Sequence, residues 1–171
     1  GRFHPVKNIE LLLKAWDKVE REMPDARLEI AGDGPRAYVE ELQRKSAGRA
    51  IFSGFLSGLA KQSALAAASV LVLPSLHENF GMVVIEAISA GVPVVISEHV
   101  QLRDFVADND LGIVAADSAD SLASAIVAAL RDAALRDRVR SRGRELVDRN
   151  YSPTVIGKKL ETMYLSVLSK S

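Results

Sequence analysis

The chain has 171 residues, of which 48% are hydrophobic and 26% charged, a composition typical of one folded soluble domain rather than of a disordered or membrane-embedded protein. Lysine plus arginine and aspartate plus glutamate balance at 22 each, which argues against a nucleic-acid-binding protein, since such proteins carry an excess of positive charge. The chain contains no cysteine, no signal peptide and no apolar run near the ~18 residues of a membrane span, so we expect one domain (residues 1–171) in the cytoplasm.

The first seventy residues alternate between helical and strand patterns. Apolar residues at helical spacing, among them Leu12, Trp16 and Val19, predict a helix over residues 8–22 that ends before Pro24. The elements expected next are a strand, a helix, a strand and an Ala-rich helix, at residues 27–31, 35–46, 50–52 and 59–68.

The alternation continues to the end of the chain. The elements expected there are strands at 70–73, 94–96 and 112–115, and helices starting near 81, 102, 122 and 131. Ser152 and Pro153 fit the N-cap and first residue of a last helix through residue 168. Strands that alternate with helices predict an α/β domain, a Rossmann-like three-layer α/β/α fold with a mostly parallel sheet.

Residues 70–95 form the strand–loop–helix–strand unit on which the functional prediction depends. Such units bind ligands at the carboxyl ends of their strands, where the loop holds Glu78 and the helix carries Glu86. Eight positions at ~1.5 Å each separate these carboxylates by up to ~12 Å, more than in the acid–base pairs of glycoside hydrolases. They are better placed to contact two parts of one long ligand, with a phosphate at the helix start, where Gly81 lets the backbone approach. A solvated loop with two surface glutamates is the alternative.

Seven short motifs, spread over most of the chain, occur in an order that resembles a known family. They are Gly1-Arg2 with Lys7-Asn8, Gly32-Asp33-Gly34-Pro35, Phe52-Ser53-Gly54, Pro74-Ser75, Glu78-x-Phe80-Gly81, Glu86-Ala87 and Gly91-x-Pro93-Val94. In this order they resemble the C-terminal, donor-binding half of a GT-B fold, group 1 (retaining) glycosyltransferase, whose hallmark is the Glu-x7-Glu spacing. The resemblance implies an enzyme that moves a sugar from a nucleoside diphosphate to an unknown acceptor without a metal or other cofactor.

The resemblance also implies roles for single residues. Arg2 and Lys7, one forked and one compact cation, would hold the donor diphosphate and offset charge on the departing nucleotide. Glu78 would face the transferred sugar, which makes these three the predicted catalytic residues, and Glu86 would accept hydrogen bonds from the ribose hydroxyls. The other residues predicted to contact the sugar and the phosphate are Asn79, Phe80, Gly81 and Met82. Those predicted to contact the base are Gly54 and Phe55.

Three other patterns support weaker interpretations. The Asp-x-Asp sequence at residues 108–110 lies in a loop and the three histidines lack metal-ligand spacing, so no metal site is predicted. The Arg-rich residues 131–149 predict a solvated helix face, with contact to an anionic membrane surface as the minor alternative. Where family members commonly carry Gly-Gly and then Glu, this chain has Val100-Gln101 and Asp104, in a region that shapes the sugar pocket of the family.

Two alternatives stay open: a nucleotide-sugar epimerase, which shares the GT-B architecture, and a flavodoxin-like binding module without catalysis. In the family a buried strand precedes the Gly-Arg pair and an N-terminal domain binds the acceptor. We therefore expect an exposed edge or gap in the sheet, and a last helix that lacks part of its partner surface. We also expect the chain alone to bind donor without transferring the sugar.

Overall fold

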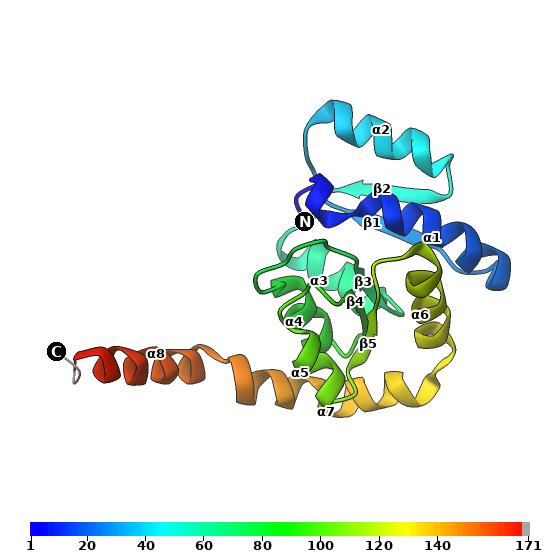
Figure 1. Ribbon diagram of the computed structural model, residues 1–171. Coiled ribbons are helices and arrows are strands. Elements are labelled where there is room, and N and C mark those ends of the chain that lie inside the picture. The colour runs from blue at the N-terminus through cyan, green and yellow to red at the C-terminus, as the bar shows by residue number, and fades with distance from the viewer. Residues whose placement is uncertain (169–171) are drawn as a thin grey trace.

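The computed structural model describes residues 1–168, and its helices and strands follow the predicted order closely. In chain order they are η1 (Pro5–Lys7), α1 (Ile9–Glu22), β1 (Leu28–Ala31), α2 (Arg36–Ser46), β2 (Ala50–Gly54), α3 (Gly58–Ala67), β3 (Leu71–Leu73), α4 (Met82–Ser89), β4 (Val94–Ser97), α5 (Arg103–Asp108), β5 (Gly112–Ala115), α6 (Ala119–Arg131), α7 (Ala133–Tyr151) and α8 (Pro153–Leu168). The three-layer α/β/α architecture with parallel strands is confirmed (Figure 1).

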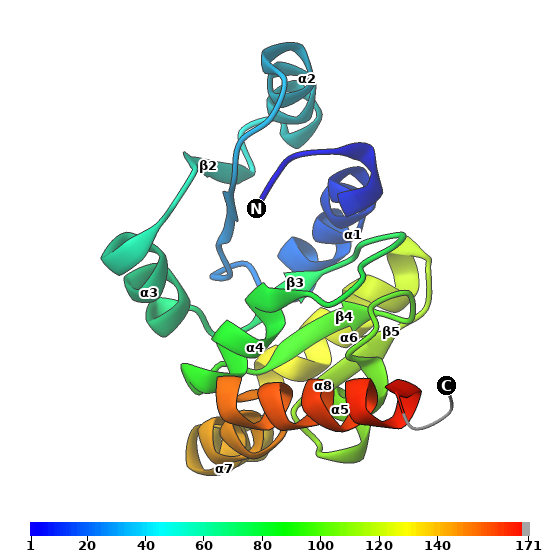
Figure 2. The same ribbon diagram turned by 90° about the vertical axis from the view of Figure 1, so that its left-hand side faces the viewer.

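The strands form two parallel sheets rather than the one sheet predicted. β1 pairs with β2 in one sheet, and β3, β4 and β5 form the other in that order. Among the described residues no strand pairing joins β1 to β3, and Figure 2 shows the two sheets as separate groups. The sheet is therefore interrupted next to the start of the chain, where the sequence led us to expect a gap.

Helices hold the two sheets together. One stripe of α1 is buried, including Leu12, Trp16 and Val19, because apolar residues recur along it at helical spacing. This stripe packs against α6, which covers one face of β4 and β5, while α4 and α5 lie on the other face (Figure 1). The α1–α6 contact thus connects the β1–β2 sheet to the β3–β4–β5 sheet.

Helix α7 packs along α4 through one narrow face. Its buried residues recur every four positions at Leu135, Val139, Gly143 and Val147. A side chain at Gly143 would come within 2.6 Å of the Ile88 carbonyl oxygen, so glycine is what lets the helices approach this closely. Most of the arginines of α7 lie away from this contact, as predicted for a solvated face.

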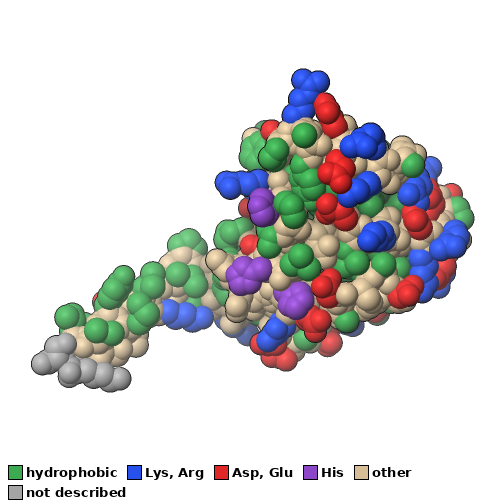
Figure 3. All heavy atoms as spheres, turned by 45° about the horizontal axis from the view of Figure 1, so that its top comes forward, with side chains coloured by type: hydrophobic (Ala, Val, Ile, Leu, Met, Phe, Trp, Pro, Cys, Tyr) green, Lys and Arg blue, Asp and Glu red, His purple; other side chains and the backbone are tan. Residues whose placement is uncertain are grey.

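Helix α8 projects from the rest of the domain (Figures 1 and 3). It starts as predicted, because the Ser152 Oγ accepts a hydrogen bond from the Val155 N–H at 3.4 Å. None of its residues is buried, and its large exposed apolar side chains are Leu160, Met163, Tyr164, Leu165, Val167 and Leu168. Across residues 1–168, every helix is too short or too polar to cross a bilayer.

Candidate functional site

The N-terminal segment is fixed against the carboxyl ends of β1 and β2. The Phe3 N–H donates to the Asp33 carbonyl at 2.6 Å, and the Gly32 N–H donates to the Gly54 carbonyl at 2.7 Å. Gly32 has to be glycine here, because a Cβ would lie 2.1 Å from the Gly1 oxygen and 2.4 Å from the Phe3 ring. The segment that carries the predicted cations is therefore packed directly on the loops after these strands.

An ion pair links this segment to the loop after β3. Lys7 Nζ bonds to a carboxylate oxygen of Glu78, and the two side chains are only 27% and 18% exposed. Two backbone bonds hold the partners in place: Leu76 N–H donates to the Val6 oxygen at 2.8 Å, and Glu78 N–H donates to the His99 oxygen at 3.3 Å. The structure thus brings together two of the predicted catalytic residues.

A second lysine–glutamate pair lies beside the first. Lys61 Nζ, on α3, is 2.7 Å from Glu86 Oε1, on α4. The side chains of this pair are 40% and 33% exposed, more than those of Lys7 and Glu78. The two glutamates that the sequence singles out are thus each paired with a lysine from a different part of the chain.

The start of α4 lies between the two glutamates in the chain, and no side chain caps it. Gly81 occupies its N-cap position with φ +77°, a left-handed conformation that favours glycine. The position is tight, since a Cβ on Gly81 would touch Glu78 Cγ at 3.4 Å. Met82, the first helical residue, is 59% exposed. The first N–H groups of a helix have no intrahelical acceptor, so this end is suited to an anion.

The remaining predicted residues lie around this edge. The Arg2 side chain is exposed, and its backbone bridges to Asp33. Gly54 ends β2 with φ +70°, and the next residue, Phe55, is 69% exposed. Asn79 is exposed in the loop between the two glutamates. Among the described residues, none of these side chains forms a hydrogen bond or ion pair with the lysine–glutamate pairs, so their predicted roles stay predictions.

Phe80 has a structural role that the sequence did not reveal. Its ring packs edge-on against Tyr151, at the end of α7, with the ring centres 5.4 Å apart. Tyr151 also packs at 90° on Phe105 of α5, 4.9 Å away, and its burial raises the pKa of its hydroxyl. The loop that carries Glu78 is therefore anchored to the end of α7 through Tyr151, which in turn packs on α5.

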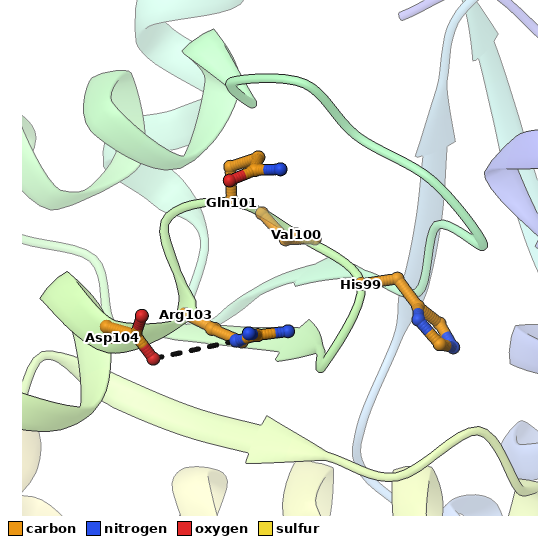
Figure 4. Close-up of a pocket in the computed structure, with 5 residues that line it drawn as sticks. All are labelled: His99, Val100, Gln101, Arg103 and Asp104. Carbon is orange, nitrogen blue, oxygen red and sulfur yellow. Dashed lines mark ion pairs between the residues drawn. The ribbon is translucent and has the colours of Figure 1, made fainter.

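The loop after β4 forms a small hollow next to Glu78. Its volume is about 60 Å³ and its lining residues, drawn in Figure 4, are His99, Val100, Gln101, Arg103 and Asp104. Arg103 and Asp104 lie side by side with 3.5 Å between Nε and Oδ1. The Gln101 N–H donates to the Glu78 backbone carbonyl at 3.2 Å, so the hollow is joined directly to the Glu78 loop.

The three histidines, His4, His77 and His99, are exposed on the face shown in Figure 3. They do not form a metal site with each other or with carboxylates: no group of three or more such ligands occurs among residues 1–168.

Lys61 is the residue of this site that sequence reasoning missed. It stands in an Ala-rich helix with no motif around it, and only the folded chain shows that it reaches a glutamate 25 residues further on. A lone lysine of this kind leaves no signal in a single sequence.

The comparisons with known proteins show the family and the fold of this chain. A model of the family "Glycosyl transferases group 1" matches residues 1–146. The phosphatidyl-myo-inositol mannosyltransferase of Mycolicibacterium smegmatis is 35% identical over 170 residues, which cover 98% of this chain and 44% of that protein. The chain thus spans less than half the length of this relative.

Two solved structures share the fold. HepE of Anabaena, in complex with UDP and glucose, superimposes with a TM-score of 0.82 at 22% identity, over 97% of this chain and 47% of that one. The C-terminal domain of the group 1 glycosyl transferase LpcC from Francisella tularensis gives a TM-score of 0.76 at 21% identity, over 90% and 84%. The chain belongs to the group 1 glycosyl transferase family and has the α/β/α fold of a GT-B C-terminal domain.

Proposed function

We propose that this chain is the donor-binding half of a retaining glycosyltransferase, which transfers a sugar from a nucleoside diphosphate to an acceptor. The observation that carries the proposal is the start of α4, which no side chain caps and which lies between Glu78, paired with Lys7, and Glu86. A nucleoside diphosphate sugar has an anionic centre between a sugar and a ribose. This matches an anion site with a carboxylate on either side.

The diphosphate would bind to Arg2, Lys7 and the first N–H groups of α4. Arg2 offers a planar fork of donors and Lys7 a compact charge, and the two together suit phosphate oxygens. As the bond between sugar and phosphate breaks, negative charge builds up on the leaving nucleotide. Cations already in place lower the energy of that transition state without a metal ion.

The two ends of the donor would meet the two glutamates. Glu86 would accept hydrogen bonds from the ribose hydroxyls, and the main chain at Gly54 and Phe55 would contact the base. Glu78 would face the transferred sugar together with Asn79, Phe80, Gly81 and Met82. The hollow after β4, next to Glu78, would then contribute to the choice of sugar. HepE, which shares the fold, was crystallised with UDP and glucose, so UDP is the first nucleotide to test.

The acceptor would bind outside this chain. The chain covers 44% of the mannosyltransferase and 47% of HepE, so more than half of each of those proteins has no counterpart here. We propose that an N-terminal domain supplies the acceptor wall, and that the chain by itself binds the donor but does not transfer its sugar.

Calorimetric titration with UDP, GDP and ADP tests the donor site. We expect one nucleotide to bind with saturation. Glu86→Ala should lower its affinity about tenfold or more, because a hydrogen bond to a charged group is lost. Glu41→Ala is the matched control, since Glu41 is also paired with a lysine, Lys45, but lies on α2. Failure of all three nucleotides to bind would refute the proposed donor site.

Incubation with nucleotide sugars separates the transferase from the epimerase. The proposal expects neither transfer nor conversion of the nucleotide sugar by this chain. Transfer by the purified chain would overturn the proposed need for an N-terminal domain. Conversion of a nucleotide sugar without any acceptor would instead favour the epimerase.

A further inference from the structure

Glu86, the proposed ribose ligand, is held by a lysine from another helix. Lys61 Nζ lies 2.7 Å from Oε1 of Glu86, and no hydrogen bond to Oε2 is found among the described residues. The side chains are 40% and 33% exposed, so the pair is partly shielded from solvent. One carboxylate oxygen is therefore paired with Lys61, and the other forms no hydrogen bond with the described residues.

This arrangement leaves Glu86 able to bind a diol. A carboxylate has about four acceptor sites, two on each oxygen, and Lys61 uses only one of them. Two neighbouring hydroxyls need one site on each oxygen, so the diol and Lys61 can bind at the same time. Without Lys61, the carboxylate could rotate among its staggered conformations, and binding would have to fix it at an entropic cost.

The helices that carry the pair are themselves fixed. Helix α3 is anchored by its buried residue Leu65 and contacts α4, and α4 buries Val84, Ala87 and Ile88. The backbone of Lys61 is therefore held in place by the packing of α3, and its ammonium group holds Oε1 of Glu86 through their hydrogen bond.

We propose that Lys61 is a positioning residue, which orients the Glu86 carboxylate toward the 2′- and 3′-hydroxyls of the donor ribose. The inference rests on the proposed donor site and adds to it the residue that makes the site selective for ribose. Lys61 acts through Glu86 and does not contact the reacting atoms.

The test compares a nucleoside diphosphate with its 2′-deoxy form. The nucleotide that binds best among UDP, GDP and ADP is titrated beside its 2′-deoxy analogue into the wild type, Lys61→Met, Lys61→Arg and Glu86→Gln. The wild type should prefer the ribonucleotide by about tenfold or more, the value of a hydrogen bond to a carboxylate. Lys61→Met should reduce this ratio to about that of Glu86→Gln, and Lys61→Arg should keep most of it.

The ratio of the two affinities, for the ribonucleotide and for its 2′-deoxy form, distinguishes a positioning role of Lys61 from a general structural one. If Lys61→Met weakens both nucleotides by the same factor, or changes neither, the inference is wrong while the donor site stands. If the wild type binds no nucleoside diphosphate, the proposed function fails and the inference with it. Lys45→Met, which removes the partner of Glu41 on α2, is the control and should leave the ratio unchanged.

Discussion

Lys7 and Glu78 are 71 residues apart in the chain, yet they form a partly buried ion pair that joins the N-terminal segment to the loop after β3. The lysine comes from the segment packed on the β1–β2 sheet and the glutamate from the β3–β4–β5 sheet. The pair therefore has a structural consequence as well as a place in the proposed site.

Replacing Lys7 by Met should lower both stability and nucleotide affinity. It leaves the shielded Glu78 carboxylate without its partner, at a cost of about 1–2 kcal/mol in the free energy of unfolding. The affinity for the nucleoside diphosphate should fall about tenfold or more, because one diphosphate cation is lost. Urea denaturation and calorimetry measure the two effects. Lys18→Met is the control: it breaks a pair with Asp120, which is 91% exposed, and should change stability by less than about 0.5 kcal/mol.

Replacing Gly32 by Ala should disturb the site without touching a charged residue. The added methyl group would overlap the Gly1 oxygen and the Phe3 ring, so the N-terminal segment would have to move. We expect a loss of about 1–3 kcal/mol in unfolding free energy and weaker nucleotide binding, since Arg2 and Lys7 move with that segment. Gly157→Ala, in α8, meets nothing within 4 Å and should stabilise its helix by about 0.5–1 kcal/mol. Equal effects of the two substitutions would show that the N-terminal segment is loosely held.

Stability should fall at alkaline pH because of Tyr38. Burial, and then hydrogen bonding to Glu10, whose two oxygens lie 3.0 and 2.9 Å away, raise the pKa of its hydroxyl in the folded state. In the unfolded chain a tyrosine ionises near pH 10, so above that pH the unfolded state holds fewer protons and stability decreases. Urea midpoints between pH 8 and 11 should therefore decline less steeply in Tyr38→Phe. Some slope should remain from Tyr151, whose pKa is also raised by burial. Identical slopes with and without Tyr38 would contradict the assignment.

Helix α8 should contribute little to the stability of the domain. Changing Leu160 and Tyr164, which are 45% and 63% exposed, to Glu should alter the free energy of unfolding by less than about 0.5 kcal/mol. It should also reduce self-association, seen by light scattering, because it breaks an exposed apolar surface. Leu135→Ala, at a buried position of α7, should cost about 2–5 kcal/mol in the same assay. A similar cost for both changes would mean that α8 packs on the domain in solution.

The elements with a clear apolar period could be predicted well from the sequence. Helix α1 begins and ends within a residue of its predicted limits, because its buried stripe and the proline after it are both visible in the sequence. Strand β2 runs two residues beyond its predicted end, to Gly54, whose carbonyl accepts a bond from Gly32. That extension depends on a partner strand, which a local pattern does not reveal.

The residues of the candidate site that belong to sequence motifs could be singled out from the sequence. The residues that join the site only by pairing with them in the folded chain could not. Glu78, Gly81 and Glu86 stand out by their spacing, and the structure places them around one helix start. Their partners do not stand out: Lys61 has no motif of its own, and the Phe80–Tyr151 contact joins residues that lie far apart in the chain. For the same reason, the sequence predicts parallel strands but does not show that they separate into two sheets.

Part of the affinity of the proposed donor site would depend on the α1–α6 interface, which does not contact the proposed ligand. No strand-to-strand hydrogen bond among residues 1–168 fixes the distance between the half that carries Arg2 and Gly54 and the half that carries Glu78 and Glu86. The packing of α1 on α6, the Lys7–Glu78 ion pair and the hydrogen bond from the Leu76 N–H to the Val6 oxygen connect the two halves instead. A bound donor would bridge both halves, so loosening the α1–α6 contact should weaken donor binding and reduce the rise in melting temperature that the nucleotide causes. A substitution at the buried Trp16 of α1, outside the proposed site, should then lower the donor affinity.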